Sequence, residues 1–221
     1  MKLSMILALS LLFLVAPWTS AENNIGNKHS FTWQEAKPTA ESELDRLSQA
    51  FVQLADHSRP AIVQIRVTMQ DSKGTSTQAS SSRGSGFIID PAGYILTAHH
   101  VIDKGKAIEV RLADSRRLAA QLVAADAQID IAVLRVQADA PLPIISMGDS
   151  DNIRVGHLAA VFGYPFGRES SMSLGIISRA GRSYPDSASF EYIQTDAGAY
   201  PGGSGGPLLN SSGQVIGIIT M

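Results

Sequence analysis

Hydrophobic and polar positions alternate in short runs from residue 61 onward. In 63–68, the apolar residues Val63, Ile65 and Val67 alternate with the polar residues Gln64, Arg66 and Thr68. A period of two is typical of a strand with one face on a core. Further strands are predicted at 87–89, 94–96, 107–112, 118–125, 131–136, 157–163, 172–178, 190–195, 206–209 and 214–220. Many short strands separated by glycine and proline predict an all-β barrel or sandwich.

Two segments depart from this pattern. Residues 41–57 carry apolar side chains at helical spacing, with acidic residues near the start, and Pro60 ends the run. This spacing predicts one amphipathic helix within an otherwise polar N-terminal segment. Residues 70–83 are rich in Ser, Thr, Gln and Gly, a composition that predicts a long mobile loop.

The first 21 residues have the features of an export signal. Lys2 supplies a positive charge, an apolar run covers 5–15, and small residues at 19–21 precede Glu22. The apolar run is short for a membrane span, which favours a cleaved signal over an uncleaved anchor. The chain has no cysteine and therefore no disulfides. We expect export to a bacterial periplasm, without stable membrane insertion after signal cleavage.

Composition limits the classes of function. The chain has 221 residues, 44% of them hydrophobic, and a net charge of −2. That length suffices for one large domain or two small ones. A near-neutral charge without a basic cluster argues against nucleic acid as a partner.

The segment 201–207 is the strongest candidate for chemistry. It reads Pro-Gly-Gly-Ser-Gly-Gly-Pro, with four glycines around Ser204. Such a turn can expose a hydroxyl beside two backbone N–H groups that would hold an oxyanion. Without further residues, a flexible surface loop would be the simpler interpretation.

Two upstream residue types complete a catalytic set. His99 and His100 follow the predicted strand at 94–96. Asp130 lies in an apolar stretch, either as an edge-strand charge facing water or as a buried acid that accepts a hydrogen bond from an imidazole. The order His, Asp, Ser is one of the known triad orders. A metal site from His99, His100 and His157 is a weaker alternative, because their spacing fits no common zinc pattern.

These segments resemble the catalytic motifs of trypsin-like serine proteases, most closely the bacterial HtrA/Deg branch. The motifs are Thr97–Ile102, Asp130–Ala132 and Gly202–Gly206, and the branch is also matched by Gly84–Asp90, Gly148–Ser150, Tyr164–Gly167 and Ser173–Ser178.

The resemblance assigns roles to individual residues. The aliphatic pair after the second histidine makes His100 the base, with Ser204 the nucleophile and Asp130 the orienting acid. The N–H groups of Gly202 and Ser204 would form the oxyanion hole, and Ala199 would help to shape a substrate pocket. No metal or cofactor is implied. Three positions depart from the family pattern, namely Gly203, Tyr164 and Tyr200.

The resemblance also implies a fold, substrates and an assembly. We expect two antiparallel Greek-key barrels, the second lacking its last strand because the chain ends at Met221. The predicted division is a signal at 1–21, an N-terminal segment at 22–59, a first barrel at 60–145 and a second, incomplete barrel at 146–221. The family often adds PDZ domains after this point.

Unfolded or damaged exported polypeptides are the implied substrates of a serine endopeptidase. Phe31 and Trp33 are candidates for a homotrimer contact, or they simply cover the barrel. The alternative function is a catalytically impaired protease scaffold that acts as a binding or chaperone-like module.

Overall fold

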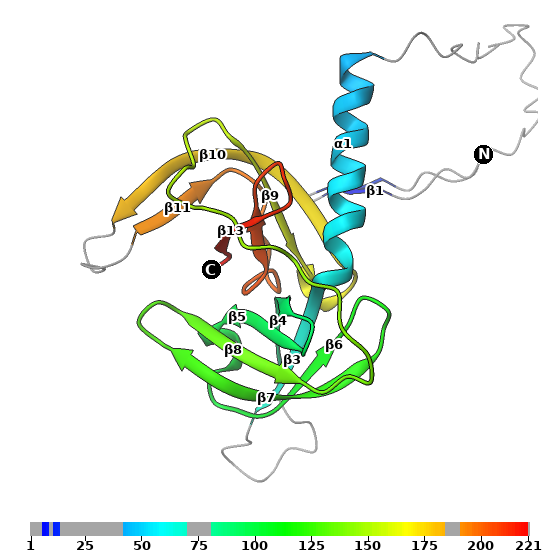
Figure 1. Cartoon of the computed structure of the whole chain (residues 1–221), viewed down its shortest axis with the longest axis vertical. Helices are drawn as coiled ribbons and strands as arrows, with labels where there is room; N and C mark the ends of the chain where they lie inside the picture. The colour runs from blue at the N-terminus through cyan, green and yellow to red at the C-terminus, as the bar shows by residue number, and fades with distance from the viewer. Residues whose placement is uncertain (1–5, 9–10, 14–41, 70–80, 184–190, 221) are drawn as a thin grey trace, which may run out of the picture. The chain divides into compact units, whose positions relative to one another are not determined.

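The computed structural model describes residues 6–8, 11–13, 42–69, 81–183 and 191–220 (Figure 1). The chain divides into two compact units, Met1–Ala40 and Glu41–Met221. In the first unit, β1 (Ile6–Ala8) pairs antiparallel with β2 (Leu11–Phe13). The rest of the predicted signal at 1–21 lies outside the described residues, as do Phe31 and Trp33. Among the described helices, none has both the length and the apolar character that crossing a bilayer would require.

The second unit begins with the predicted helix, α1 (Glu43–Ser58). Ser42 and Asp45 form a reciprocal capping box at its start, and Pro60 lies in the short helix η1 (Arg59–Ala61) that follows. The observed bounds differ from the predicted 41–57 by two residues at the start and one at the end. Leu54 packs against the core beneath the helix.

A closed six-stranded barrel follows, shown in cyan to green in Figure 1. Around the barrel the strands run β3-β4-β5-β8-β7-β6, and all neighbouring pairs are antiparallel. Val63, Ile65 and Val67 of β3 are fully buried inside it, as their alternation predicted. The strands are β3 (Ile62–Met69), β4 (Ser81–Asp90), β5 (Tyr94–Ala98), β6 (Gly105–Arg111), β7 (Arg117–Asp126) and β8 (Ile131–Val136).

The predicted loop at 70–83 is too long at its C-terminal end. Residues 81–83 belong to β4, where Arg83 pairs with Arg66 and Ser81 with Thr68 of β3. Polar composition suggested a loop, but backbone pairing with β3 extends the strand through these polar residues. The remainder, 70–80, lies outside the described residues.

The second sheet is curled, five-stranded and open within the described residues. Its order is β11-β10-β9-β12-β13, so that β11 and β13 form its edges. The strands are β9 (Leu158–Gly163), β10 (Ser171–Ser183), β11 (Glu191–Thr195), β12 (Pro207–Leu209) and β13 (Val215–Ile218). The long β10 extends five residues past the predicted end at 178 because it pairs with β11 there. The short helix η2 (Pro165–Gly167) lies between β9 and β10.

One hydrophobic cluster joins the two sheets. Ile62 and Phe87 of the first barrel share it with Phe162 and Leu209 of the second sheet, and all four are at most 1% exposed. Burial of these four apolar side chains stabilises the packing of the two sheets against each other. The loops at the facing ends of both sheets are thereby brought next to one another. The exact domain limits given above stay predictions.

Candidate active site

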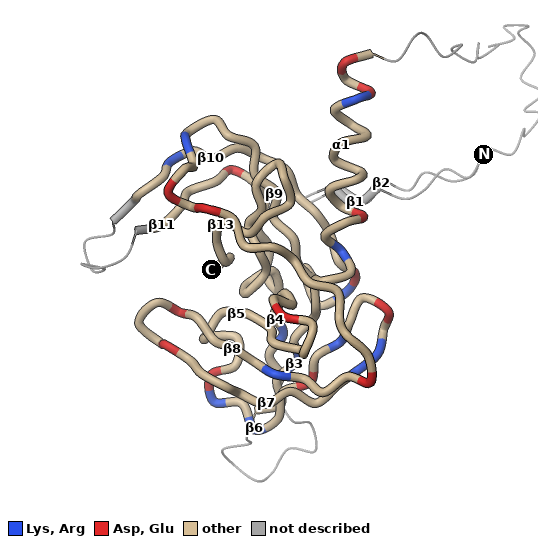
Figure 2. Tube along the Cα trace, in the orientation of Figure 1, with Lys and Arg blue, Asp and Glu red and all other residues tan. Residues whose placement is uncertain are grey.

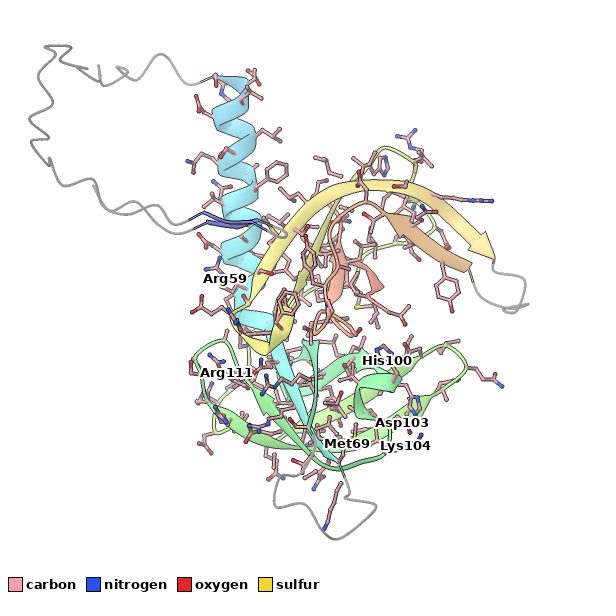
Figure 3. All side chains as sticks on the ribbon, turned by 180° about the vertical axis from the view of Figure 1, so that it is seen from behind. Arg59, Met69, His100, Asp103, Lys104 and Arg111 are labelled. Carbon is pink, nitrogen blue, oxygen red and sulfur yellow. The ribbon has the colours of Figure 1, made fainter. Side chains whose placement is uncertain are left out.

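His100 and Asp130 are brought together by two adjacent strands. His100 lies in α2 (His99–Ile102), directly after β5, and Asp130 lies directly before β8, the neighbour of β5. His100 Nδ1 is 2.6 Å from Asp130 Oδ2, and the backbone N–H of His100 donates to Asp130 Oδ1 at 2.8 Å. Figure 3 shows His100 on the side of the barrel that faces the second sheet. The adjacent His99 makes no such contact through its ring, and only its N–H donates, to the Asp130 carbonyl at 3.0 Å.

The sequence left Asp130 as either an edge-strand charge facing water or a buried acid, and the structure shows a partly buried residue just outside the strand. It precedes β8 with φ +54, and its side chain is 23% exposed. The left-handed backbone turns both its carbonyl and its carboxylate toward the first N–H groups of α2. The Asp130 carboxylate is therefore paired rather than simply facing water, although it keeps partial access to solvent.

A third partner of Asp130 comes from the far end of the chain. The Thr220 hydroxyl donates to Asp130 Oδ2 at 2.6 Å. Partial burial raises the pKa of Asp130, but the hydrogen bonds from Thr220 and His100 outweigh it and hold the pKa below its ordinary 3.8. Sequence reasoning missed Thr220, because an isolated threonine after a strand carries no motif.

The glycines of the serine loop, residues 201–206, lie in close contact with neighbouring backbone atoms. Gly205 has φ +83, and a Cβ there would lie 2.3 Å from the Ser85 carbonyl oxygen. A Cβ at Gly206 would lie 2.1 Å from the Phe162 carbonyl oxygen. Side chains at these positions would collide with backbone atoms, so glycine is required for the close approach.

The N–H groups of this loop fall into two sets. Those of Gly203, Gly205 and Gly206 donate to the carbonyls of Tyr200, Ile219 and Gly203, at 2.7, 2.7 and 2.9 Å. Those of Gly202 and Ser204 have no acceptor among the described residues. The carbonyl of Pro201, which shares a peptide bond with the Gly202 N–H, accepts from Phe166 N–H at 2.7 Å. Because the two groups of a trans peptide point in opposite directions, this contact aims the Gly202 N–H away from Phe166.

Ser85 of β4 fixes the loop from the first barrel. It is fully buried, and its hydroxyl donates to the Gly202 carbonyl at 2.6 Å and accepts from Tyr164 N–H at 2.8 Å. Its own N–H donates to the Ser204 carbonyl at 2.8 Å. Ser85 thus donates hydrogen bonds to the backbone carbonyls of Gly202 and Ser204, the two residues whose own N–H groups have no described acceptor. The sequence places Ser85 in a family motif but gives no sign of this role.

The Ser204 side chain has no partner in the described part of the chain. The residue is 8% exposed, and no hydrogen bond joins its Oγ to His100 or to any other described group. Its hydroxyl is not sealed from solvent, since Ser58 Oγ and Gln64 Nε2 are the only sealed and unpaired side-chain atoms there. A hydroxyl in this condition is available to an incoming molecule.

The remaining candidate residues lie in different surroundings. Ala199 is partly buried and packs against the hydrophobic cluster of the second sheet, to which β9, β10, β12 and β13 contribute. His157 accepts from the backbone N–H of Arg154 at 3.2 Å through its Nδ1. Within the described ranges, no three His, Cys, Asp or Glu side chains gather in a way that could hold a metal ion.

The clefts in the described surface include two of about 310 Å³ each. One lies between the end of α1 and the first barrel and contains none of the candidate residues. The other borders Gly202 and is lined by Ser81, Arg83, Phe166, Gly167, Pro201 and Gly202. Only the second adjoins the serine loop, although Ser204 is not in its lining.

A family model described as the trypsin-like peptidase domain matches residues 84–218, more than half of the chain. The chain belongs to this family. The matched stretch contains His100, Asp130 and Ser204, and all of the strands from β5 to β13.

Curated relatives are similar over somewhat less than two thirds of this chain. A "Probable periplasmic serine endoprotease DegP-like" of Marinomonas sp. (strain MWYL1) is 49% identical over 138 residues, which cover 62% of this chain and 29% of the relative. The protein of the same name from Hahella chejuensis (strain KCTC 2396) is 46% identical over 141 residues, covering 64% of this chain and 30% of the relative. The matched part of the chain therefore spans less than a third of these relatives.

Solved structures confirm the predicted fold. The HtrA-type protease AlgW with a tripeptide aligns with a TM-score of 0.69 at 36% identity, over 76% of this chain and 53% of that one. The same protease with a decapeptide gives 0.69 at 33% identity, over 77% and 58% of the two chains. The closed barrel and the curled second sheet are thus the two halves of the HtrA-type protease fold.

Proposed function

We propose that this chain is a serine endopeptidase domain in which His100, Asp130 and Ser204 cleave peptide bonds. The observation that carries the proposal is the pairing of His100 with Asp130 opposite a glycine loop with two unpaired N–H groups. Membership of the trypsin-like family makes acyl transfer the chemistry that these groups would perform.

The hydrogen-bond pattern assigns the proton positions. The lowered pKa of Asp130 keeps its carboxyl ionised near neutral pH, so that Oδ2 accepts a proton from His100 Nδ1. In the neutral imidazole, Nε2 is then unprotonated and can take the Ser204 proton. Ser204 Oγ attacks the peptide carbonyl, and the N–H groups of Gly202 and Ser204 stabilise the oxyanion. His100 next gives the proton to the leaving amine, and water repeats the cycle on the acyl-enzyme.

Labelling with a fluorophosphonate tests this assignment. The chain should bind the reagent covalently at Ser204, and the Ser204→Ala variant should stay unlabelled. The same pair should be compared for hydrolysis of an unfolded casein. Labelling at another residue, or equal labelling of both proteins, contradicts the proposal.

One observation favours the alternative of a protease scaffold that only binds polypeptides. No hydrogen bond joins Ser204 to His100 among the described residues. Catalytic hydrogen bonds often form only when substrate is bound, so this gap is compatible with activity. The scaffold function would be supported if the chain neither reacted with the fluorophosphonate nor hydrolysed casein, and yet suppressed aggregation of an unfolded protein.

Exported, unfolded polypeptides are the substrates we propose. The relatives are named periplasmic endoproteases, and residues 1–21 of this chain have the pattern of a cleaved signal. Fusing residues 1–25 to a reporter that is active only in the periplasm tests export. A Lys2→Glu fusion should export less, because the positive charge at the start of the signal is lost.

We also propose that the domain assembles as a homotrimer through Phe31 and Trp33. The basis is the resemblance to the HtrA/Deg branch together with two isolated aromatics in a polar segment. Light scattering should give three times the monomer mass for the chain. The Phe31→Ala, Trp33→Ala double variant should give the monomer mass, and a trimer that survives this change contradicts the proposed contact.

A further inference from the structure

The cleft beside Gly202 has a single charged wall. Among the described residues, Arg83 is the only ionisable residue in its lining, and none of the described lining residues is a carboxylate that could offset the guanidinium. Phe166 forms an apolar wall; it is 62% exposed and stacks on Tyr200 with ring centroids 6.4 Å apart. A cation next to an exposed aromatic suits a ligand with a short apolar stem and an anionic end.

The Arg83 side chain lies within this cleft, against Gly167. A Cβ built on Gly167 would lie 2.5 Å from Arg83 Cδ and 3.2 Å from its Nη1, so the arginine side chain lies across the bare glycine. Within the described part of the chain, the guanidinium forms neither an ion pair nor a hydrogen bond. Its donors are therefore open to an anion from outside.

A second arginine stands directly opposite. The register of β3 and β4 pairs Arg66 with Arg83, and directly opposed residues of an antiparallel pair share one face of the sheet. Like charges in that arrangement are destabilising. Arg66, too, has no ion pair in the described ranges. Acidic and basic residues are otherwise distributed over both sheets (Figure 2). The register of β6 and β7 also pairs Arg111 with Arg117, but Arg117 has an ion pair there, with Glu109 at 3.2 Å.

The reaction geometry places the cleft relative to the scissile bond. His100 must reach the leaving nitrogen, so the leaving half of the substrate lies on the side of the first barrel. Arg83 belongs to that barrel, through β4, whereas Ala199 follows β11 and packs against the second sheet. The cleft also borders Gly202, whose N–H would hold the carbonyl oxygen.

We propose that Arg83 is a specificity-determining residue that selects an acidic side chain in the leaving half of the substrate. The subsite takes Asp or Glu at one of the first two positions after the scissile bond. The carboxylate binds the Arg83 guanidinium, and the methylene stem packs on Phe166. This inference rests on the proposed endopeptidase function.

Cleavage of matched peptides tests the subsite. Internally quenched peptides share one acyl half and carry Glu, Gln or Lys at the first two leaving positions. At low salt, kcat/KM should be about two- to fivefold higher for Glu than for Gln, the range of an exposed ion pair. The preference should vanish in Arg83→Gln, reverse toward Lys in Arg83→Glu and shrink as salt rises. Arg66→Gln is the matched control, with the same charge change outside the cleft, and should keep most of the preference.

Two further measurements separate the inference from the proposed function. Fluorophosphonate labelling has no peptide leaving group and should be equal in the wild type and in Arg83→Gln. Binding of the same peptides to Ser204→Ala, followed by fluorescence anisotropy, needs no catalysis and should show the same order of affinities.

The outcomes are distinct. Cleavage with equal kcat/KM for Glu and Gln overturns the subsite and leaves the endopeptidase standing. Equal loss in Arg66→Gln and Arg83→Gln overturns the assignment to Arg83. A chain that neither labels nor cleaves contradicts the proposed function, and the binding series then decides the subsite alone: equal affinities overturn it, and a Glu preference lost in Arg83→Gln supports it.

Discussion

The two halves of the candidate site differ in how completely their polar groups are paired. In the first barrel, the Asp130 carboxylate accepts from His100 N–H, His100 Nδ1 and Thr220 Oγ1. In the loop at 201–206, Gly202 N–H, Ser204 N–H and Ser204 Oγ have no described partner. Paired groups are fixed in place, whereas unpaired groups can act on a ligand. We infer from this comparison that the first barrel orients the proposed base, His100, and that the second sheet presents the proposed nucleophile and oxyanion donors.

Removing the negative charge of Asp130, in the paired half, should have the largest effect on peptide hydrolysis. Asp130→Asn keeps the shape of the side chain, but the new amide N–H can donate to His100 Nδ1. That contact favours the imidazole tautomer in which Nε2 carries the proton and cannot act as the base. We expect kcat/KM for a peptide substrate to fall by about 10⁴-fold, the scale known for this change in another trypsin-like protease. Circular dichroism should report an intact fold. Activity within tenfold of the wild type would contradict the proposed role of Asp130.

The unpaired half is tested by a side chain at Gly202. This residue has φ +93, and a Cβ would lie 2.7 Å from the Tyr164 carbonyl oxygen and 3.0 Å from Phe166 N. The loop must shift in Gly202→Ala, which moves the proposed oxyanion donor and should lower kcat by about 10²- to 10³-fold. Gly156→Ala is the control, because Gly156 has φ +92 but nothing within 4 Å of a Cβ. Similar losses in both variants would trace the effect to backbone strain alone.

Both halves could be predicted from the sequence only in part. Alternation predicted the strands because each has one face on a core, as in β3, and motif order predicted His100, Asp130 and Ser204. The left-handed turn at Asp130 and the bonds of Ser85 and Thr220 could not be predicted. Ser85 and Gly202 are 117 residues apart and Thr220 and Asp130 are 90 apart, so these pairings depend on how the sheets pack.

The link between the two halves is tested at Ser85. In Ser85→Ala the Gly202 carbonyl and Tyr164 N–H lose a buried partner, which should lower the free energy of unfolding by about 1–3 kcal/mol. kcat should fall with it, since the loop is released from β4. Urea unfolding and peptide hydrolysis measure the two effects. Ser82→Ala, on the same strand and without a described side-chain hydrogen bond, should change neither; equal effects in both variants would remove Ser85 from its linking role.

Thr220→Val tests the smallest contribution to the paired half. The hydroxyl stabilises ionised Asp130, so its loss should move the pKa of Asp130 upward toward 3.8. Because the folded pKa is depressed, this stabilisation is present above the ordinary value and is lost as pH falls through the folded pKa. The difference in Tm between wild type and variant should therefore be largest above pH 4 and shrink in more acidic buffer. Carbon-13 shifts of the Asp130 carboxyl group measure the pKa directly, and an unchanged titration would show that Thr220 does not tune this acid.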